Sequence, residues 1–379
     1  MRLQFGVFDH IEPIPGQELG TIYKDRLAQL EIFDINGFYG YHLAEHHSPA
    51  VHSLAPSQNV FLSAASQRTK QIKLAPCIYV LPLHHPLRLI EEICMLDHLS
   101  DGRLEVGIGR GGVLEAFFWG SDWDVERNYT KYQETLAIMR QGLSHDSLTF
   151  KGEFYDFENL PMRLRPKQLP YPPMWYMRNV EIAATEGMNC IIVGNLDGLE
   201  ANVKRYHEIW AERHGHESTT IQGTEPKIGL VNHLVLADTE DEAVEAARPA
   251  WEEYLWNLSA PRRIEAEQRG LTQFLDGGMN TRPAGLPDRE AAERFQSPRS
   301  TNSQRQLRRQ EPGDVAEQNK TSNFRVIAGT PDTIRTYLDE YLTTGANYFV
   351  CAFHFGNMDS SIAEHSIELF VQDVMPHYV

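Results

Sequence analysis

The sequence of 379 residues has few cysteines and lacks any segment that would suit a membrane. Its four cysteines lie apart inside apolar runs and form no C-x-x-C pair, which argues against a disulfide framework and indicates buried thiols in a reducing compartment. They are Cys77, Cys94, Cys190 and Cys351. No apolar run reaches about 18 residues and no signal sequence precedes the first expected strand, so we expect a cytoplasmic protein.

Basic residues are scarce relative to acidic ones, with 35 Lys and Arg against 52 Asp and Glu and a net charge of −17. An acidic chain repels phosphate backbones and anionic lipid headgroups, so neither a nucleic acid nor a membrane partner is expected. Hydrophobic residues make up 41% of the sequence, which is enough for a large core. The length suits one α/β barrel with insertions.

Several catalytic signatures are missing. There is no G-x-S-x-G elbow for a serine nucleophile, and the glycines at 107–112 lack the spacing of a dinucleotide loop. No H-x-H follows the first expected strand, and adjacent pairs such as His46-His47 and His84-His85 cannot easily ligate one ion. A metal hydrolase is therefore only a minor alternative, and no metal site is predicted.

The most informative stretch lies at 71–112. An apolar run at 72–81 without strict alternation predicts a strand that is covered on both faces. A helix is expected from Pro86 to a stop at Gly102, followed by a second buried strand at 104–108. This order is the strand–helix–strand crossover of a parallel sheet.

Short apolar strands alternate with helices along most of the chain. The expected strands lie at 3–8, 38–43, 72–81, 104–108, 174–177, 190–193, 228–236 and 348–353. Eight such strands favour a closed (β/α)8 TIM barrel over an open sheet, with a single domain over 1–379. Residues 116–120 are expected to form an aromatic loop, and 148–157 a small hairpin outside the sheet. The stretch 261–325 is poor in apolar anchors and predicts a long mobile insertion.

Polar residues directly follow the expected strands, at the end where parallel α/β folds build their sites. They are Asp9, His10, Glu45, His46, His84, His85, Arg110, Arg178, Asn179, Asn195 and His354. Arg110, Arg127 and the helix start at Arg178-Asn179 favour an anionic ligand such as a phosphate. A surface ion pair explains Arg127 equally well on local grounds.

Taken together, the motifs resemble those of the bacterial luciferase-like flavin monooxygenases. The matching segments are Q-F-G-V-F at 4–8, L-A-E-H-H at 43–47, V-L-P-L-H-H-P-L-R at 80–88, L-D-H-L-S-D-G-R-L-E-V-G-I-G-R-G at 96–111, A-G-T-P-D-T-I at 328–334 and L-F-V-Q-D-V-M-P at 369–376. The resemblance implies a (β/α)8 barrel that binds reduced FMN, forms a C4a-peroxyflavin with O2 and oxidises a small organic substrate. The aromatic residues at 117–119 suggest an apolar substrate, although core packing would also explain them.

By this resemblance His46 is the candidate catalytic acid or base near the C4a–N5 edge of the flavin, flanked by Glu45 and His47. A histidine suits this role because its pKa lies near neutrality. The alternative is a loop histidine that is hydrogen-bonded only for structural reasons.

The resemblance also assigns the cofactor contacts. Arg110 and Arg127 match FMN-phosphate contacts, and Arg178 and Asn179 are further candidates although the loop that carries them is shorter than in the family. Cys77-Ile78 matches a place where relatives have a non-prolyl cis peptide under the flavin ring. Gly109 stands where luciferase has a reactive cysteine, so light emission is not implied.

The resemblance further implies a separate flavin reductase that supplies reduced FMN, and a homodimer, since dimers are common among relatives. It identifies 261–325 with an enlarged mobile lid, for which the alternative is a loop without a role. Two other functions stay open. One is an FMN- or deazaflavin-dependent oxidoreductase of the same fold without oxygen chemistry. The other is a non-catalytic flavin-binding subunit.

Overall fold

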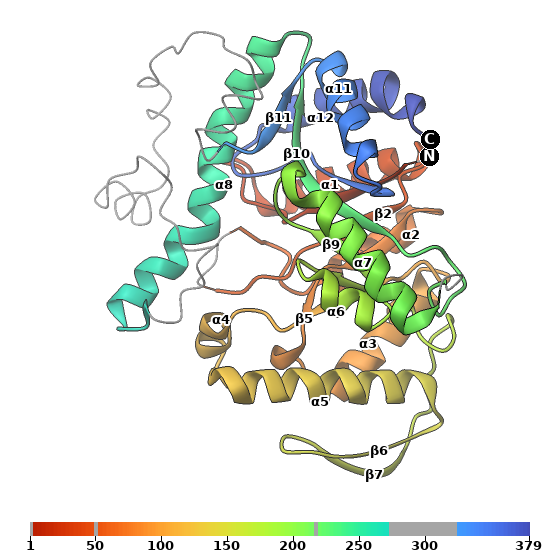
Figure 1. The fold of residues 1–379 in the computed structure, drawn as a ribbon. Coiled ribbons are helices and arrows are strands. Elements are labelled where there is room, and N and C mark those ends of the chain that lie inside the picture. Colours follow the sequence, from red (N-terminus) through yellow and green to blue (C-terminus); the bar gives the residue numbers. More distant parts are fainter. Residues whose placement is uncertain (1–2, 49–51, 216–218, 273–323) are drawn as a thin grey trace.

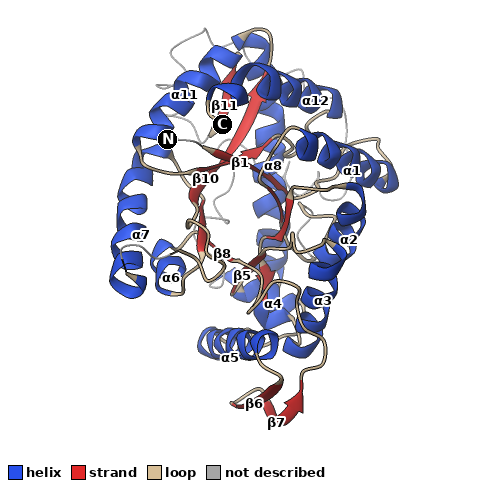
Figure 2. Cartoon of the chain, turned by 90° about the vertical axis from the view of Figure 1, so that its right-hand side faces the viewer, coloured by secondary structure: helices blue, strands red, loops and turns tan. Residues whose placement is uncertain are grey.

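The computed structural model describes residues 3–48, 52–215, 219–272 and 324–379. Its centre is one parallel sheet that curls into a nearly closed barrel surrounded by helices (Figure 1, Figure 2). The strands follow the order β3-β2-β1-β12-β10-β9-β8-β5-β4, and a parallel bridge from Leu74 in β3 to Leu104, just before β5, closes the ring. The predicted α/β barrel is thereby confirmed.

The strands of the barrel are β1 (Gln4–Asp9), β2 (Gly40–Leu43), β3 (Lys73–Pro76), β4 (Tyr79–Val80), β5 (Val106–Gly109), β8 (Met174–Met177), β9 (Asn189–Ile192), β10 (Ile228–Leu236) and β12 (Tyr348–Ala352). Outside the ring, β11 (Val326–Gly329) pairs with β10, and β6 (Ser147–Lys151) pairs with β7 (Asp156–Pro161) as the expected hairpin. The helices are α1 (Leu19–Ile35), α2 (Gln58–Arg68), α3 (Pro86–Leu99), α4 (Val113–Phe118), α5 (Val125–Ser144), α6 (Val180–Thr185), α7 (Leu199–His214), α8 (Glu240–Gln268), α11 (Pro331–Thr343) and α12 (Ser360–Leu369).

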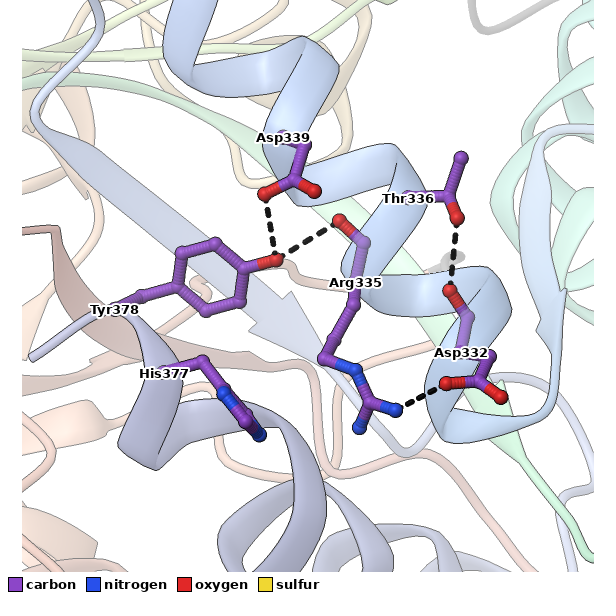
Figure 3. A pocket seen from close by; sticks show the side chains of 6 residues that line it. All are labelled: Asp332, Arg335, Thr336, Asp339, His377 and Tyr378. Carbon is purple, nitrogen blue, oxygen red and sulfur yellow. Dashed lines mark hydrogen bonds and ion pairs between the residues drawn. The ribbon is translucent and has the colours of Figure 1, made fainter.

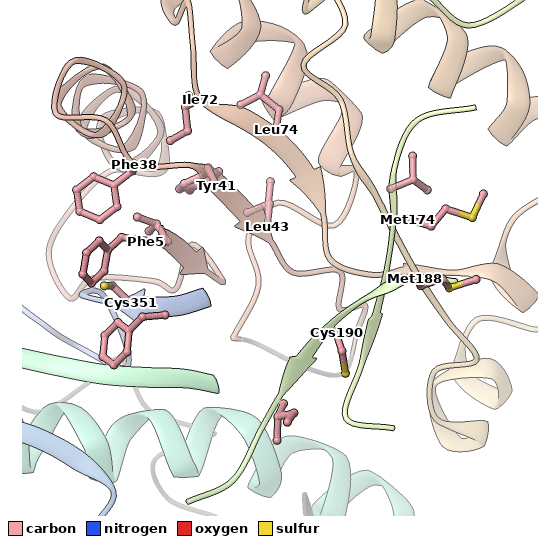
Figure 4. Packing of buried hydrophobic residues seen from close by; sticks show 14 of the residues in the cluster. Phe5, Phe38, Tyr41, Leu43, Ile72, Leu74, Met174, Met188, Cys190 and Cys351 are labelled. Atoms are coloured by element: carbon pink, nitrogen blue, oxygen red, sulfur yellow. The ribbon is translucent and has the colours of Figure 1, made fainter. Parts of the chain in front are cut away.

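Alternate residues of each strand face two different cores. One set packs under the helices, as Figure 4 shows for Phe5, Tyr41 and Leu43. The other set consists of strand residues that meet one another, such as Trp175 and Tyr348, and fills the barrel interior. Because both faces of the sheet are covered, its strands are apolar without strict alternation.

The expected strand at 72–81 is interrupted. It divides into β3 and β4 around the bond between Cys77 and Ile78, which is cis as the resemblance implied. The chain then turns into a short 3₁₀ helix at Leu81–Leu83, so the prediction of one continuous strand was wrong. The interruption lets β4 pair with β5, while β3 stays beside β2.

One other local expectation was wrong, and one strand was missed. Residues 116–120 are not a loop, because α4 covers most of them, and no proline or glycine interrupts that helix. The strand at Val326–Gly329 was not foreseen; it pairs with the second half of β10, which is nine residues long. The barrel still corresponds to the eight predicted strands, because β3 and β4 are two halves of one of them.

The mobile insertion expected at 261–325 is wrong for its first part, which is helical. Helix α8 continues to Gln268 and runs along one side of the barrel, with Pro249 and Pro261 inside it (Figure 1). A proline removes one backbone hydrogen bond, but the buried side of α8, including Trp251 and Ala260, holds the helix in place. The remainder at 273–323 lies outside the described residues, and so does the proposed lid. In the described part of the chain, no helix is long and apolar enough to cross a membrane.

We predict that Gly107→Ala destabilises the fold, because a Cβ there would lie 2.5 Å from the carbonyl oxygen of Pro76 and 2.9 Å from Cα of Cys77. Both atoms belong to the backbone and cannot rotate away, so we expect a loss of about 1–3 kcal/mol in urea unfolding. Gly20→Ala is the matched control, since a Cβ there meets nothing within 4 Å. It should leave stability unchanged or raise it by up to about 1 kcal/mol. Equal losses in the two variants would contradict this packing.

Candidate active site

Three histidines meet at the carboxyl ends of the first two strands. His10 follows β1, His46 follows β2, and His52 lies further along the loop after β2. The ring centroids of His46 and His52 are 4.0 Å apart, and those of His46 and His10 are 5.7 Å apart. The prediction that strand-end residues converge on one rim therefore holds for His10 and His46, while His52 was not singled out from the sequence.

Glu45 anchors the loop that carries His46. Its buried carboxylate lies 2.9 Å from Nε2 of His47 and 3.0 Å from Nε2 of His84. Burial acts to raise the pKa of Glu45, but the charge and hydrogen bond of His84, together with the hydrogen bond of His47, bring it below its ordinary value. Burial acts to lower the pKa of His84, and Glu45 outweighs that effect and raises it. Glu45 thus holds two loops together. Its hydrogen bonds to other side chains go to His47 and His84, and in the described part of the chain it forms none with His46.

Glu115 and Arg262 complete the surroundings of His46, and the sequence did not single out either residue. Glu115 in α4 accepts a hydrogen bond of 2.7 Å from the backbone N–H of His47. Nη2 of Arg262 in α8 lies 2.9 Å from Nδ1 of His46 and 3.8 Å from Oε1 of Glu115. Both residues lie in stretches expected to be irregular, and no motif marked them.

His46 is largely buried, with 19% of its side chain exposed. Burial lowers its pKa well below the ordinary value, and His52, Arg262, His10 and Arg178 add to that effect. Burial, followed by Arg262 and Arg178, lowers the pKa of His10 to about 3. Both imidazoles are therefore neutral at neutral pH.

The nitrogens of His10, His46 and His52 lie within 4.8 Å of one another, a spacing that raises the question of a metal ion. Nδ1 of His46 already accepts a hydrogen bond from Arg262, and the guanidinium charge would oppose a nearby cation. We therefore assign no metal to these three side chains.

The part of the rim next to β2 is formed by the Cys77-Ile78 peptide, where the backbone N–H of Cys77 donates a hydrogen bond of 2.7 Å to the carbonyl oxygen of Leu43, and by the end of β5 beyond it. A Cβ on Gly109 would lie 2.1 Å from Cδ1 of Ile78, so this glycine allows the two segments to approach. Cys77 is buried, and burial raises the pKa of its thiol, which therefore stays protonated. These surroundings therefore offer no thiolate nucleophile.

The three arginines predicted to bind phosphate differ in their surroundings. Arg110 follows β5 and Arg178 follows β8, and within the described ranges neither guanidinium makes a hydrogen bond or ion pair. Arg178 is close enough to the histidines to lower the pKa of His10 and His46. Arg127 is exposed on α5 and paired with Asp122 at 2.7 Å and with Glu153.

Asn179 acts as the N-cap of α6, because its side chain accepts a hydrogen bond of 2.9 Å from the backbone N–H of Ile182. This cap engages the side-chain oxygen in the helix itself. The cofactor contacts predicted for Asn179 and Arg127 stay predictions, and both side chains have protein partners.

A surface pocket lies away from this rim, beside α11 and the C-terminal turn (Figure 3). Its charged groups are already engaged: Arg335 pairs with Asp332, and Tyr378 donates to Asp339 at 2.9 Å. We find no chemistry in this pocket that would compete with the rim.

The profile of the family described as luciferase-like monooxygenase matches residues 3–348. An uncharacterized protein of Sinorhizobium fredii, y4wF, is 39% identical over 68% of this chain and 74% of its own length. The oxygenase component of the flavin-dependent trigonelline monooxygenase of Acinetobacter baylyi is 26% identical over 65% of this chain and 68% of its own length.

Solved structures share the fold. The oxygenating constituent of 3,6-diketocamphane monooxygenase from Pseudomonas putida, in complex with FMN, has a TM-score of 0.69 at 18% identity, covering 100% of this chain and 99% of its own. The coenzyme F420-dependent tetrahydromethanopterin reductase of Methanopyrus kandleri has a TM-score of 0.63 at 18% identity, covering 100% of both chains. At these sequence identities, the structural similarity shows a shared barrel fold and nothing about activity.

We predict that Glu45→Gln destabilises the protein by about 3 kcal/mol near pH 6, because it removes a buried charge from its partners. The contribution of Glu45 exists above its unfolded pKa of about 4.3 and is lost as pH falls. That of His84 exists below its unfolded pKa of about 6.5 and is lost as pH rises through the raised folded value. The destabilisation should therefore be about 1 kcal/mol smaller at pH 9.

Urea unfolding of both proteins at pH 6 and pH 9 measures this difference. Glu31→Gln is the control, because Glu31 forms an exposed pair with Arg68 and should cost less than about 1 kcal/mol at either pH. A loss that does not depend on pH in Glu45→Gln would show that the Glu45–His84 pair is not charged.

Proposed function

Because the chain belongs to the luciferase-like monooxygenase family, we propose that it is an FMN-dependent monooxygenase, which uses reduced FMN and O2 to place one oxygen atom in a small organic substrate. One observation carries the proposal: neutral His46 lies on the same rim as two arginines, Arg110 and Arg178, whose guanidinium groups have no partner among the described residues. Guanidinium groups can bind the phosphate of FMN, and a neutral imidazole can form a hydrogen bond near the reacting atoms.

The residues of the rim fit the cofactor. Arg110 and Arg178 would hold the phosphate of FMN, and the Cys77-Ile78 peptide with Gly109 would face the ring system. In an acidic chain, guanidinium groups at strand ends that have no partner among the described residues favour an anionic ligand. When bound, reduced FMN would supply the electrons for the reduction of O2.

The side chains of the protein then have separate tasks. His46 would present a neutral ring to the reacting atoms, and Glu45 would keep the adjacent loops in place through His47 and His84. Beside His10, Tyr254 lies 5.7 Å away between ring centroids, and it packs with Trp251 and Phe355. This aromatic wall would exclude water and suits a substrate with an apolar part.

The proposal includes a reductase as a separate protein, since the trigonelline enzyme is named as an oxygenase component. It also includes the homodimer expected from the sequence. The alternative of a deazaflavin-dependent oxidoreductase is favoured by one observation, the likeness of the barrel to an F420-dependent reductase. The two functions differ in whether oxygen enters the product.

We predict that the protein, supplied with chemically reduced FMN and ¹⁸O2, adds one ¹⁸O atom to at least one compound of a panel of small organic molecules. The panel should include trigonelline and cyclic ketones, and mass spectrometry of the products detects the label. Replacing reduced FMN with reduced deazaflavin should abolish the labelling. Hydride transfer from reduced deazaflavin without oxygen uptake would contradict the proposal and support the alternative.

His46→Ala is the control for this experiment. The variant should keep FMN affinity within a few-fold and lose labelling by at least about 10²-fold, as expected for a group that acts on the reacting atoms. A variant that binds FMN and labels at the rate of the unchanged protein would remove His46 from the reaction. A non-catalytic flavin-binding subunit would give no label in either protein.

We predict that Arg178→Ala and Arg110→Ala each weaken FMN binding by about 10-fold or more, because each loses a charge-assisted hydrogen bond. The loss should shrink at high salt, where exposed charges are screened. Arg127→Ala should change affinity by less than about 3-fold, since its guanidinium is engaged by two carboxylates. Fluorescence titration of FMN measures all three, and a loss confined to Arg127→Ala would reverse the assignment.

A further inference from the structure

We propose that Arg262 is a positioning residue that fixes His46 as the tautomer with its proton on Nε2, which makes His46 a hydrogen-bond donor and not a proton-transfer group. The significance of this inference for catalysis rests on the proposed function. The tautomer itself is a property of the protein alone. Arg262 lies in the part of the sequence where we expected a mobile insertion.

The geometry leaves one arrangement of protons. Nη2 of Arg262 is 2.9 Å from Nδ1 of His46. A guanidinium carries only donors, so Nδ1 has to accept this hydrogen bond and cannot carry a proton of its own. A neutral His46 therefore has its proton on Nε2.

Arg262 is held in place from several sides. Only 5% of the residue is exposed, Nη1 lies 3.4 Å from the carbonyl oxygen of Leu258, and Glu115 lies 3.8 Å from Nη2. One and a half turns earlier in α8, Nδ2 of Asn257 donates a hydrogen bond of 3.0 Å to Glu12, which also binds the backbone N–H of Gly356. These contacts fasten α8 to loops after β1 and β12, so the guanidinium has a fixed position.

The charged and titratable groups around His46 come from every neighbouring element. They are His10 after β1, His52 in the loop after β2, Glu115 in α4, Arg178 after β8 and Arg262 in α8. Glu115 is the only acid among them, and burial raises its pKa. A second positive charge on His46 would thus face Arg262 with little compensation, which keeps the ring neutral.

This arrangement limits what His46 can do. Nδ1 is occupied by Arg262, so it cannot serve as a base without breaking that hydrogen bond. Release of the Nε2 proton would leave an imidazolate anion, which a neutral histidine does not form at physiological pH. What remains is a stable N–H donor, which can stabilise developing negative charge through a fixed hydrogen bond. The acid–base role that the sequence suggested for His46 is replaced by this one.

NMR of the full chain labelled with ¹⁵N-histidine tests the inference without cofactor or substrate. The His46 signals are assigned by their loss in His46→Gln. We expect Nδ1 of His46 to have the shift of an acceptor nitrogen and Nε2 that of a protonated one, with no titration between pH 6 and pH 8. A ring protonated on Nδ1, or one that titrates in this range, would overturn the proposal.

Substitutions of Arg262 distinguish a positioning role toward His46 from a purely structural role. In Arg262→Met we expect a mixture of tautomers and an upward shift of the His46 titration by about one pH unit or more, because a neighbouring positive charge is gone. Arg262→Lys should restore the low titration but only part of the tautomer preference, since lysine is a mobile point charge. Arg263→Met is the matched control: the adjacent residue pairs with Glu267 at 3.3 Å and should leave His46 unchanged.

An unchanged His46 spectrum in Arg262→Met would overturn the proposal. If Arg262→Met does not fold, the tautomer and titration in the unchanged protein still decide the question. The outcome is separable from the proposed function: a fixed Nε2 tautomer in a protein that transfers no ¹⁸O would refute the monooxygenase and leave this inference standing. A protein that transfers ¹⁸O but whose His46 lacks a fixed Nε2 tautomer would refute only this inference.

Discussion

All the strands of the barrel run in the same direction, and this constraint brings the candidate functional residues together. Because each strand delivers its carboxyl end to the same rim, His10, His46, Arg110 and Arg178 gather on it although the sequence separates them by up to 168 positions. The barrel can keep this form because its interior is filled. Nε2 of His42 lies 2.7 Å from the hydroxyl of Tyr348, and the indole of Trp175 donates to buried Glu105 at 2.5 Å.

Two buried acidic side chains in loops at the strand ends, Glu45 and Glu12, hold neighbouring segments in different ways. Glu45 joins the loops after β2 and β4 through two imidazoles, and it acts within the rim. Glu12 fastens α8, and burial raises its pKa to about 8, so at neutral pH it is mainly a neutral carboxyl group that holds Asn257 and Gly356. The first arrangement depends on charge and the second on hydrogen bonding in a dry environment. Together they place elements from both ends of the chain around His46.

The sequence was sufficient for the parts of the molecule governed by local rules. Strand β10 and the start of α3 follow from apolar runs and a proline in the first turn, and both lie where they were expected. Other parts of the structure depend on tertiary contacts, which the sequence does not reveal. Helix α8 passes Pro261 because its buried side is held against the barrel, and this continuation carries Arg262 to His46. No periodicity or motif could predict a hydrogen bond across 216 positions, so Arg262 and Glu115 were missed.

Arg110 and Arg178, whose guanidinium groups have no partner in the described part of the chain, belong to a protein whose net charge is −17. A dianionic phosphate approaching at random would meet a repulsive potential over most of the surface and an attractive one near Arg110 and Arg178. Such a field selects the direction of approach before any contact forms, and it acts over about one Debye length, roughly 8 Å at physiological ionic strength. The excess of acidic residues, which argued against nucleic acid and membranes, would thus also turn a phosphate-bearing ligand with its phosphate toward Arg110 and Arg178.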